Sequence, residues 1–152
     1  NSLDGTIPEC LGNLSSSFLE IDLGNNNFHG QIPEKLKVSY LNLLEVGNNN
    51  LNDTFPNWLG NLDRLHVLIF RSNRFYGQVG NFDVTVSLTR LRIIDLSCNN
   101  FSGYLPTNFF EHLHAIREGY GKKVEPGYMK DVLGKKTLNY AFGLSFTTKG
   151  LE

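Results

Sequence analysis

The histidines and cysteines of this chain are the residue types best suited to nucleophilic, acid–base or metal chemistry. Nucleophilic catalysis needs a base within reach of a Ser or Cys nucleophile. Spacing places no such partner on a face shared with any of the histidines, which are His29, His66, His112 and His114. His112 and His114 lie two positions apart on an expected helix, so they point to different faces and make a weak metal pair. We therefore expect no enzymatic activity, no metal site and no cofactor.

The cysteines and the lysine-rich stretches also lack the spacing of a ligand-binding motif. Cys10 and Cys98 show no C-x-x-C spacing and no His pair at zinc-site distance, so we expect two unpaired thiols. Gly134-Lys-Lys-Thr137 is similar to the end of a phosphate loop, but Met129 occupies the first glycine position of that motif. A formal net charge of −1 argues against a nucleic-acid partner, which requires a basic surface.

Acidic residues at one position of a repeated strand pattern are the strongest candidates for a binding role. The candidate concave binding face consists of Asp22, Glu45, Ile69, Arg71 and Asp95. Because alternate side chains of a strand point to opposite sides, these residues form columns across neighbouring strands. Acids one strand apart repel each other unless a cation or a basic partner compensates, which indicates a recognition surface. The alternative is that the acids only keep this face soluble.

These positions depend on a repeat that occupies residues 1–106. The four full units read FLEIDLGNNNFHGQIP, LNLLEVGNNNLNDTFP, LHVLIFRSNRFYGQVG and LRIIDLSCNNFSGYLP. Asp53 replaces a recurrent glycine in the second unit, and Val79-Gly80 replaces Ile-Pro in the third. Each unit contains a short strand with one buried face, which becomes covered only when neighbouring units stack. The repeat accounts for the unusual abundance of 23 Leu and 18 Asn.

One asparagine recurs directly after the strand of each unit. These residues are Asn26, Asn49, Asn73 and Asn99, and their spacings are 23, 24 and 26 positions. Each lies where the backbone turns away from the sheet and leaves N–H and C=O groups without sheet partners. We expect the side-chain amides to bind these groups and to form a structural ladder.

The repeat is identified as the leucine-rich repeat, and its G-x-I-P extension resembles the plant-specific extracellular subtype. PECLGNLSSS, NDTFPNWLGNL, LHVLIFRSNRFYGQV and LRIIDLSCNNFSGYLPTNFF are similar to the late repeats of plant leucine-rich-repeat receptor-like proteins. The similarity is to the disease-resistance type, which lacks a kinase domain. It implies an α/β fold, a short, curved, right-handed leucine-rich-repeat solenoid with one partial and four full units over residues 1–106.

Residues 107–152 do not continue the repeat. KDVLGKK and LSFTTKGLE are similar to the segment that closes a non-repeat island in the same family, so we expect a truncated island region here. From the residues alone, a strand with one aromatic face is indicated by the alternating Leu138, Tyr140, Phe142, Leu144 and Phe146. Residues 1–106 carry 7 basic and 10 acidic groups, whereas 107–152 carry 7 and 5. This contrast favours contact of the island with the repeats or with an acidic partner.

Three N-x-S/T sequons predict N-glycosylation if the chain is secreted. Their asparagines are Asn13, Asn52 and Asn100. Asn52 and Asn100 fall on outward positions of the repeat, away from the asparagine ladder.

The resemblance implies extracellular recognition at the plasma membrane, with a protein or peptide ligand and with signalling through co-receptor kinases. Membrane attachment would come only from a C-terminal helix that these residues do not include. One alternative is the ectodomain of a leucine-rich-repeat receptor kinase, which a downstream kinase domain would reveal. A secreted inhibitor of microbial wall-degrading enzymes is a second alternative, although such inhibitors resemble uninterrupted repeats. A truncated product without a signalling role is the third.

Overall fold

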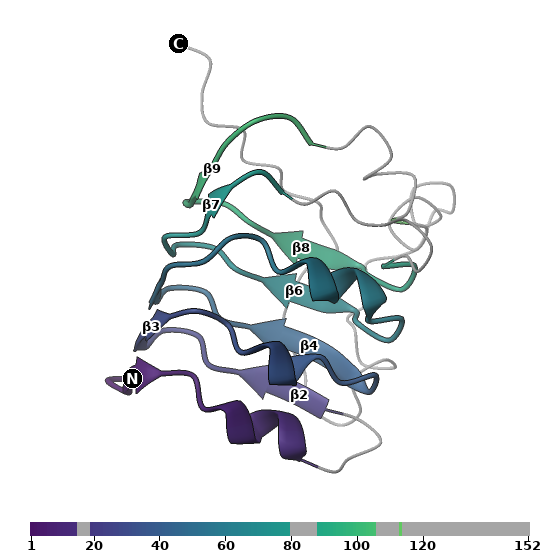
Figure 1. Cartoon of the computed structure of the whole chain (residues 1–152), viewed down its shortest axis with the longest axis horizontal. Coiled ribbons are helices and arrows are strands. Elements are labelled where there is room, and N and C mark those ends of the chain that lie inside the picture. The colour runs from purple at the N-terminus through teal and green to yellow at the C-terminus, as the bar shows by residue number, and fades with distance from the viewer. Residues whose placement is uncertain (15–18, 80–87, 106–112, 114–152) are drawn as a thin grey trace, which may run out of the picture.

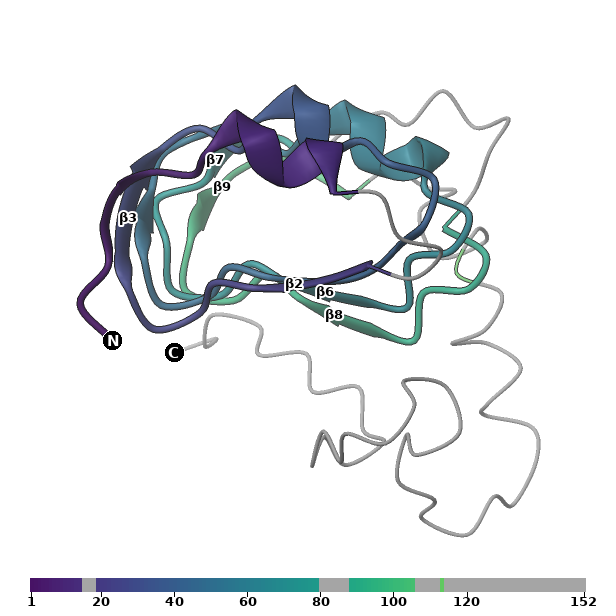
Figure 2. The ribbon, with the colours of Figure 1, turned by 90° about the horizontal axis from the view of Figure 1, so that it is seen from below.

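The chain forms a stack of similar coils, each built from one repeat (Figure 1). The computed structural model describes residues 1–14, 19–79, 88–105 and Leu113. Seen along the stack, the coils are flattened loops, with the main strands on one long side and the short helices on the other (Figure 2). This arrangement confirms the predicted leucine-rich-repeat solenoid. The predicted island region, 107–152, lies outside the described residues apart from Leu113, which is buried in the core.

The main sheet carries one strand from each full repeat. In the described part of the chain its parallel order is β2 (Leu19–Asp22), β4 (Leu41–Glu45), β6 (Val67–Ile69) and β8 (Ile93–Asp95). Equivalent residues of successive repeats pair with each other, as in the row Ile21, Leu44, Leu68 and Ile94. Since these residues all point to the core, the repeat period sets both the register and the buried face.

Short strands beyond the turn form a second set of parallel pairs, which we did not predict. They are β1 (Asp4–Thr6), β3 (Asn27–Gly30), β5 (Asn50–Leu51), β7 (Tyr76–Gly77) and β9 (Asn100–Phe101). Gly30, Gly77 and Gly103 end this stretch with φ between 75° and 80°, a conformation that favours glycine. Asp53, which replaces the equivalent glycine, instead accepts hydrogen bonds from Ile32 N–H and Thr54 N–H at 3.1 and 2.8 Å.

The side opposite the main sheet carries short helices. They are the 3-10 helices η1 (Glu9–Asn13), η2 (Glu34–Leu36) and η3 (Asn57–Asn61), each of which directly follows a proline. Their backbones pack closely, because a Cβ on Gly12 would lie 1.9 Å from the carbonyl oxygen of Lys35. Glycine at this position therefore allows neighbouring coils to approach on the helical side.

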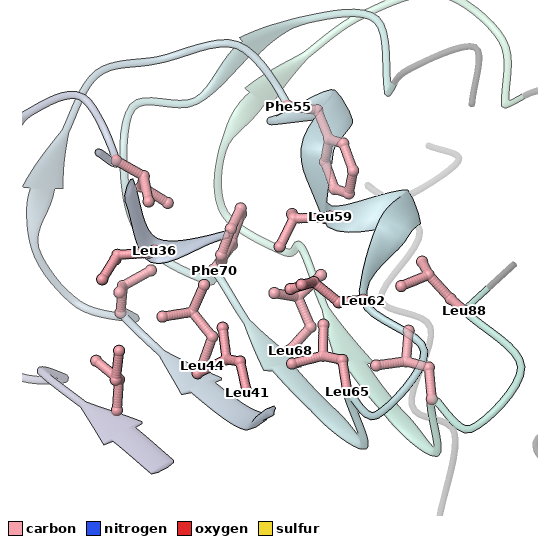
Figure 3. Packing of buried hydrophobic residues seen from close by; sticks show 14 of the residues in the cluster. Leu36, Leu41, Leu44, Phe55, Leu59, Leu62, Leu65, Leu68, Phe70 and Leu88 are labelled. Carbon is pink, nitrogen blue, oxygen red and sulfur yellow. The ribbon is translucent and has the colours of Figure 1, made fainter. Parts of the chain in front are cut away.

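The interior between sheet and helices is filled by leucine and phenylalanine (Figure 3). Leu44 and Leu68 contribute from the strands and Leu59 from η3, and all three have no exposed surface. Phe70 and Phe75 stack with ring centroids 4.7 Å apart, so that aromatic packing joins the strand to the turn that follows it. No single repeat could bury this surface alone, and the core is continuous along the stack.

The recurrent asparagines lie at the turn after each main strand and bind both their own coil and the preceding one. Asn49 Nδ2 donates to the carbonyl oxygens of Leu23, Val46 and Gly47 at 3.0, 3.0 and 3.2 Å. Its Oδ1 accepts from Phe28 N–H at 2.9 Å. Asn73 and Asn99 repeat this arrangement one and two coils further on. Asn26 does so at the first turn, where its Oδ1 accepts from Leu3 N–H.

The residue before each ladder asparagine adopts a left-handed conformation that the sequence did not reveal to us. The φ values are 57°, 54°, 52° and 54° for Asn25, Asn48, Ser72 and Cys98. Asparagine tolerates this region better than other non-glycine residues. The conformation reverses the chain sharply enough for the next side chain to point back at the turn carbonyls.

Replacing Asn49 with alanine tests the ladder. Asn49→Ala removes one of the hydrogen bonds that the carbonyls of Leu23, Val46 and Gly47 accept, and it leaves the buried Phe28 N–H without its partner. We expect a loss of about 2–4 kcal/mol in the free energy of unfolding, because buried polar groups without partners are costly. Urea unfolding followed through the single Trp58 measures it. The matched control is Asn50→Ala, an exposed neighbour whose Oδ1 accepts a hydrogen bond from Arg74 Nη2 at 3.3 Å. Equal stability of the two variants would contradict a structural role for the ladder.

Candidate binding face

The predicted candidate residues lie on the outer sheet face. We use this name for the side of β2, β4, β6 and β8 that points away from the core. The strand register places Asp22, Glu45, Ile69 and Asp95 in one row of paired positions, here called the acidic row. Asp22 is exposed, whereas Glu45 and Asp95 are partly buried. Arg71 follows β6, and its Nη1 lies 3.9 Å from Asp95 Oδ2. The structure thus brings all five candidate residues onto one surface.

A second row on the same face was not predicted. Glu20, Leu43, Val67 and Ile93 pair across the strands two residues before the acidic row. Leu43, Val67 and Ile69 form a hydrophobic cluster that is separate from the core and has Ile93 packed against it. We call these four residues the apolar patch. Because side chains alternate along each strand, the sequence also indicates this second outward row. We predicted only the inward residues and the acidic row.

The carboxylates of the acidic row also stabilise the turns. Asp22 Oδ1 accepts from Gly24 N–H at 3.1 Å, and Glu45 Oε1 accepts from Gly47 N–H at 2.9 Å. Asp95 Oδ1 accepts from both Ser97 N–H and Ser97 Oγ–H, at 3.0 and 2.6 Å. Each acid therefore binds the backbone two residues later. This bond gives the acids a structural role in addition to any recognition role.

Glu45 is the most constrained carboxylate of the row. A Cβ on Gly24 or Gly47 would lie 2.9 or 2.7 Å from Glu45 Oε1, so both glycines provide space for this side chain. Burial raises the pKa of the Glu45 carboxyl above its ordinary value, and the charges of Asp22 and Asp95 raise it further. The Gly47 N–H bond and the Arg71 charge act in the opposite direction. Burial and the neighbouring acids therefore both disfavour the ionised form of Glu45.

The other sequence candidates lie away from this face or outside the described residues. His29 is exposed on β3, and His66 is partly buried just before β6, where burial is the main cause that lowers its pKa. His112 and His114 lie outside the described residues. Cys10 and Cys98 are exposed free thiols. Within the described ranges, no group of three His, Cys, Asp or Glu could hold a metal ion, and no helix is long and apolar enough to cross a membrane.

The sequon asparagines are exposed and come from elements other than the main sheet. Asn13 ends η1, Asn52 directly follows β5, and Asn100 begins β9. Glycans on these residues would extend from the helical side and from the short strands. None of the three sequons lies on the outer sheet face.

Comparison with known proteins agrees with this architecture. The family described as Leucine Rich Repeat matches residues 40–62 and 90–112. Receptor-like protein 32 of Arabidopsis thaliana is 36% identical over a match that covers 100% of this chain and 20% of that protein. Receptor-like protein 18 of the same plant is 44% identical, over 72% of this chain and 13% of that protein. The chain thus spans a fifth or less of the length of these curated relatives.

A solved ectodomain shows the same coil. The Arabidopsis receptor kinase HAESA, in a complex with the peptide hormone IDA and the co-receptor SERK1, superposes with a TM-score of 0.62. The sequences are 32% identical, and the match covers 72% of this chain and 18% of that one. The stacked parallel strands, the asparagine ladder and the second set of short strands define a leucine-rich-repeat solenoid of the plant ectodomain type. Within that class, the chain belongs to the plant leucine-rich-repeat receptor-like proteins.

The raised pKa of Glu45 predicts a pH dependence of stability. A carboxyl whose pKa is higher in the folded than in the unfolded chain binds protons more readily when folded. The free energy of unfolding should therefore fall as the pH rises from the ordinary glutamate pKa upward through the raised pKa of Glu45. Glu45→Gln should remove this component, whereas Asp63→Asn, at an exposed loop position, should keep it. Denaturation over a pH series measures the effect, and an NMR titration that places Glu45 at or below its usual range would contradict it.

Proposed function

We propose that this chain is an extracellular recognition segment of a plant cell-surface receptor-like protein that binds a protein or peptide ligand. The observation that carries the proposal is the acidic row. Asp22 and Glu45 lie on paired positions of adjacent strands, and Asp95 continues the row beyond Ile69, with Arg71 as the basic side chain beside it. Repulsion between them is relieved when a basic group approaches, so a ligand with Lys or Arg side chains fits this row.

The location of the sequons supports the same face. Since all three belong to other elements, glycans would extend from the helical and lateral sides and would not obstruct the acidic row. The surface of stacked strands is also the face that solenoid proteins commonly use for binding. Extracellular exposure at the plasma membrane is part of this proposal.

The proposed role is pathogen perception, with defence signalling through co-receptor kinases. The HAESA complex supports the general arrangement, because that ectodomain is bound to a peptide hormone and to a co-receptor. The relatives named receptor-like proteins favour a receptor whose own chain does not signal by phosphorylation. The likeness to HAESA, a receptor kinase, favours the second candidate, an ectodomain for hormone or peptide perception. A kinase domain in the parent gene would distinguish the two.

Charge neutralisation tests the acidic row without removing its turn bonds. Glu45→Gln and Asp95→Asn each keep an oxygen that can accept the backbone N–H two residues later. In leaves that express the full receptor, the oxidative burst elicited by microbial culture filtrate should need roughly tenfold more filtrate for the double variant. Asp63→Asn, which neutralises an exposed carboxylate outside the main sheet, should respond like the parent.

The same assay contains the outcomes that would contradict the proposal. An unchanged response of the double variant would exclude the acidic row as a binding surface. If leaves with the receptor and leaves without it respond equally to every microbial filtrate, this result would argue against pathogen perception. A response to endogenous plant peptides instead would favour the hormone-receptor alternative.

Glycosylation provides a separate test of the extracellular location. Protein secreted by plant cells should lose mass on glycosidase treatment, and Asn13→Gln, Asn52→Gln and Asn100→Gln should each remove one increment of that loss. Intact-mass spectrometry measures the increments. A secreted chain with the mass of the bare polypeptide would show that none of the exposed sequons is used.

A further inference from the structure

Tyr76 is an exposed aromatic residue on the lateral side of the stack, which the short strands form. It belongs to β7, and 44% of its surface is exposed. Among the described residues, it is the one large hydrophobic residue within a strand that is exposed. The preceding Phe75 is fully buried, so the alternation of side chains turns the Tyr76 ring outward. This ring offers a large flat surface with a hydroxyl at its tip, which suits a ligand that is partly apolar and partly polar.

The residue paired with Tyr76 in the next short strand is a sequon asparagine. β7 and β9 run side by side (Figure 1), and their parallel register pairs Tyr76 with Asn100. The bonds from Asn100 N–H to Phe75 O and from Ser102 N–H to Gly77 O, at 2.8 and 2.9 Å, hold this register. Paired residues of neighbouring strands lie about 4.8 Å apart and point to the same side of the sheet. Asn100 is exposed as well, so both side chains face the solvent at one place.

We propose that the Tyr76 ring binds the first N-acetylglucosamine of a glycan on Asn100. The C–H groups of the sugar ring carry hydrogens with a partial positive charge, and the face of an aromatic ring is negative. The hydroxyl and acetamide groups of the sugar stay in water while its apolar face packs on the tyrosine. Covalent attachment keeps the sugar beside the ring, so a contact that is weak between free molecules forms here. The inference rests on the proposed glycosylation of Asn100 and is independent of the acidic row.

The strand register singles out Asn100 among the three sequons. On its other side, Tyr76 is bridged by Thr54, the third residue of the Asn52 sequon. Asn52 itself lies two residues earlier, which places it about 8 Å from Tyr76 when the offsets along and between the strands are combined. Asn13 ends η1 on the helical side. Of these three asparagines, Asn100 is the one directly paired with the aromatic residue.

Tyr104 is a second exposed tyrosine near this sequon, but its position suits the first sugar less well. It is 90% exposed and follows Asn100 by four residues, about 13 Å of extended chain. Gly103, with a φ of 80°, redirects the backbone between the two residues. Tyr104 therefore serves as a control of the same residue type.

A sugar bound to Tyr76 would connect two coils outside the core and the asparagine ladder. Tyr76 belongs to the third full repeat and Asn100 to the fourth. Glycosylation would then stabilise the stacking of these coils, in addition to shielding the surface. The contact would also direct the glycan along the lateral side.

A double-mutant cycle on the full chain, secreted by plant cells, tests the contact. Ser102→Ala removes the sequon but keeps the Asn100 side chain, and Tyr76→Ser introduces the residue type that the fourth repeat has at the equivalent position. We expect Tyr76→Ser to lower the midpoint of thermal unfolding by roughly 2–4 °C more in the glycosylated chain than in the Ser102→Ala chain. Tyr76→Phe keeps the ring and should unfold like the parent. Tyr104→Ser should have the same effect in both backgrounds.

Intact-mass spectrometry of the same samples separates the two ways in which the proposal could be wrong. If Asn100 carries no glycan, the proposed glycosylation of this residue and the contact are both wrong. If Asn100 is glycosylated and Tyr76→Ser costs the same in both backgrounds, only the contact is wrong. A difference that appears with Tyr104→Ser would show that another ring binds the sugar. A difference that is lost in an Asn52→Gln chain would show that another glycan occupies Tyr76.

A second measurement decides the question if Tyr76→Ser is not secreted. Tyr76→Leu keeps an apolar side chain but removes the aromatic face. An endoglycosidase that cuts between the first two sugars of oligomannose glycans should cleave at Asn100 roughly fivefold faster in this variant than in the parent. Cleavage at Asn13 should keep its rate. Equal rates at Asn100 in the two folded chains would overturn the proposal.

Discussion

The asparagine ladder is the interaction on which the rest of this structure depends. Every coil must turn sharply after its main strand, and the turn leaves carbonyl groups without sheet partners near the core. One side-chain amide per coil binds these carbonyls and simultaneously accepts an N–H from the preceding coil. Turn formation and coil stacking are therefore a single event, and the distance between successive ladder residues determines which strands become neighbours.

This constraint explains why the surface can vary while the fold persists. The ladder and the inward leucines set the register of the main sheet, so the outward positions can vary, although three of them carry acids that accept a turn N–H. The outer sheet face accordingly differs from coil to coil, with acidic, apolar and basic side chains at equivalent places. Asp53 shows the same tolerance on the lateral side, since its carboxylate binds two backbone N–H groups where other coils use a left-handed glycine.

Features that follow from the spacing of residues in the sequence could be predicted. Features that depend on how the turn backbone and neighbouring side chains meet in the folded chain could not. The repeat period was sufficient for the solenoid, for the inward row through Leu44 and Leu68, and for the alignment of Glu45 with Asp95. The bond from Gly47 N–H to Glu45 depends on the direction of the turn backbone, which residue types do not specify. Val67 lies on the outer side of the main sheet and is nonetheless buried, and the periodic pattern carries no signal for this.

The third coil shows how these demands compete at one position. An acid at residue 69 would accept a turn N–H, as the acids of the other three coils do. It would also lie between Glu45 and Asp95 and repel both carboxylates. It would also place a carboxylate next to Val67, in a patch from which water is excluded. Isoleucine avoids both costs, and Arg71 contributes a positive charge near Asp95 two residues later. The departure from the repeat at Ile69 is thus the point where the acidic row and the apolar patch meet, and it marks this coil as the centre of the candidate binding face.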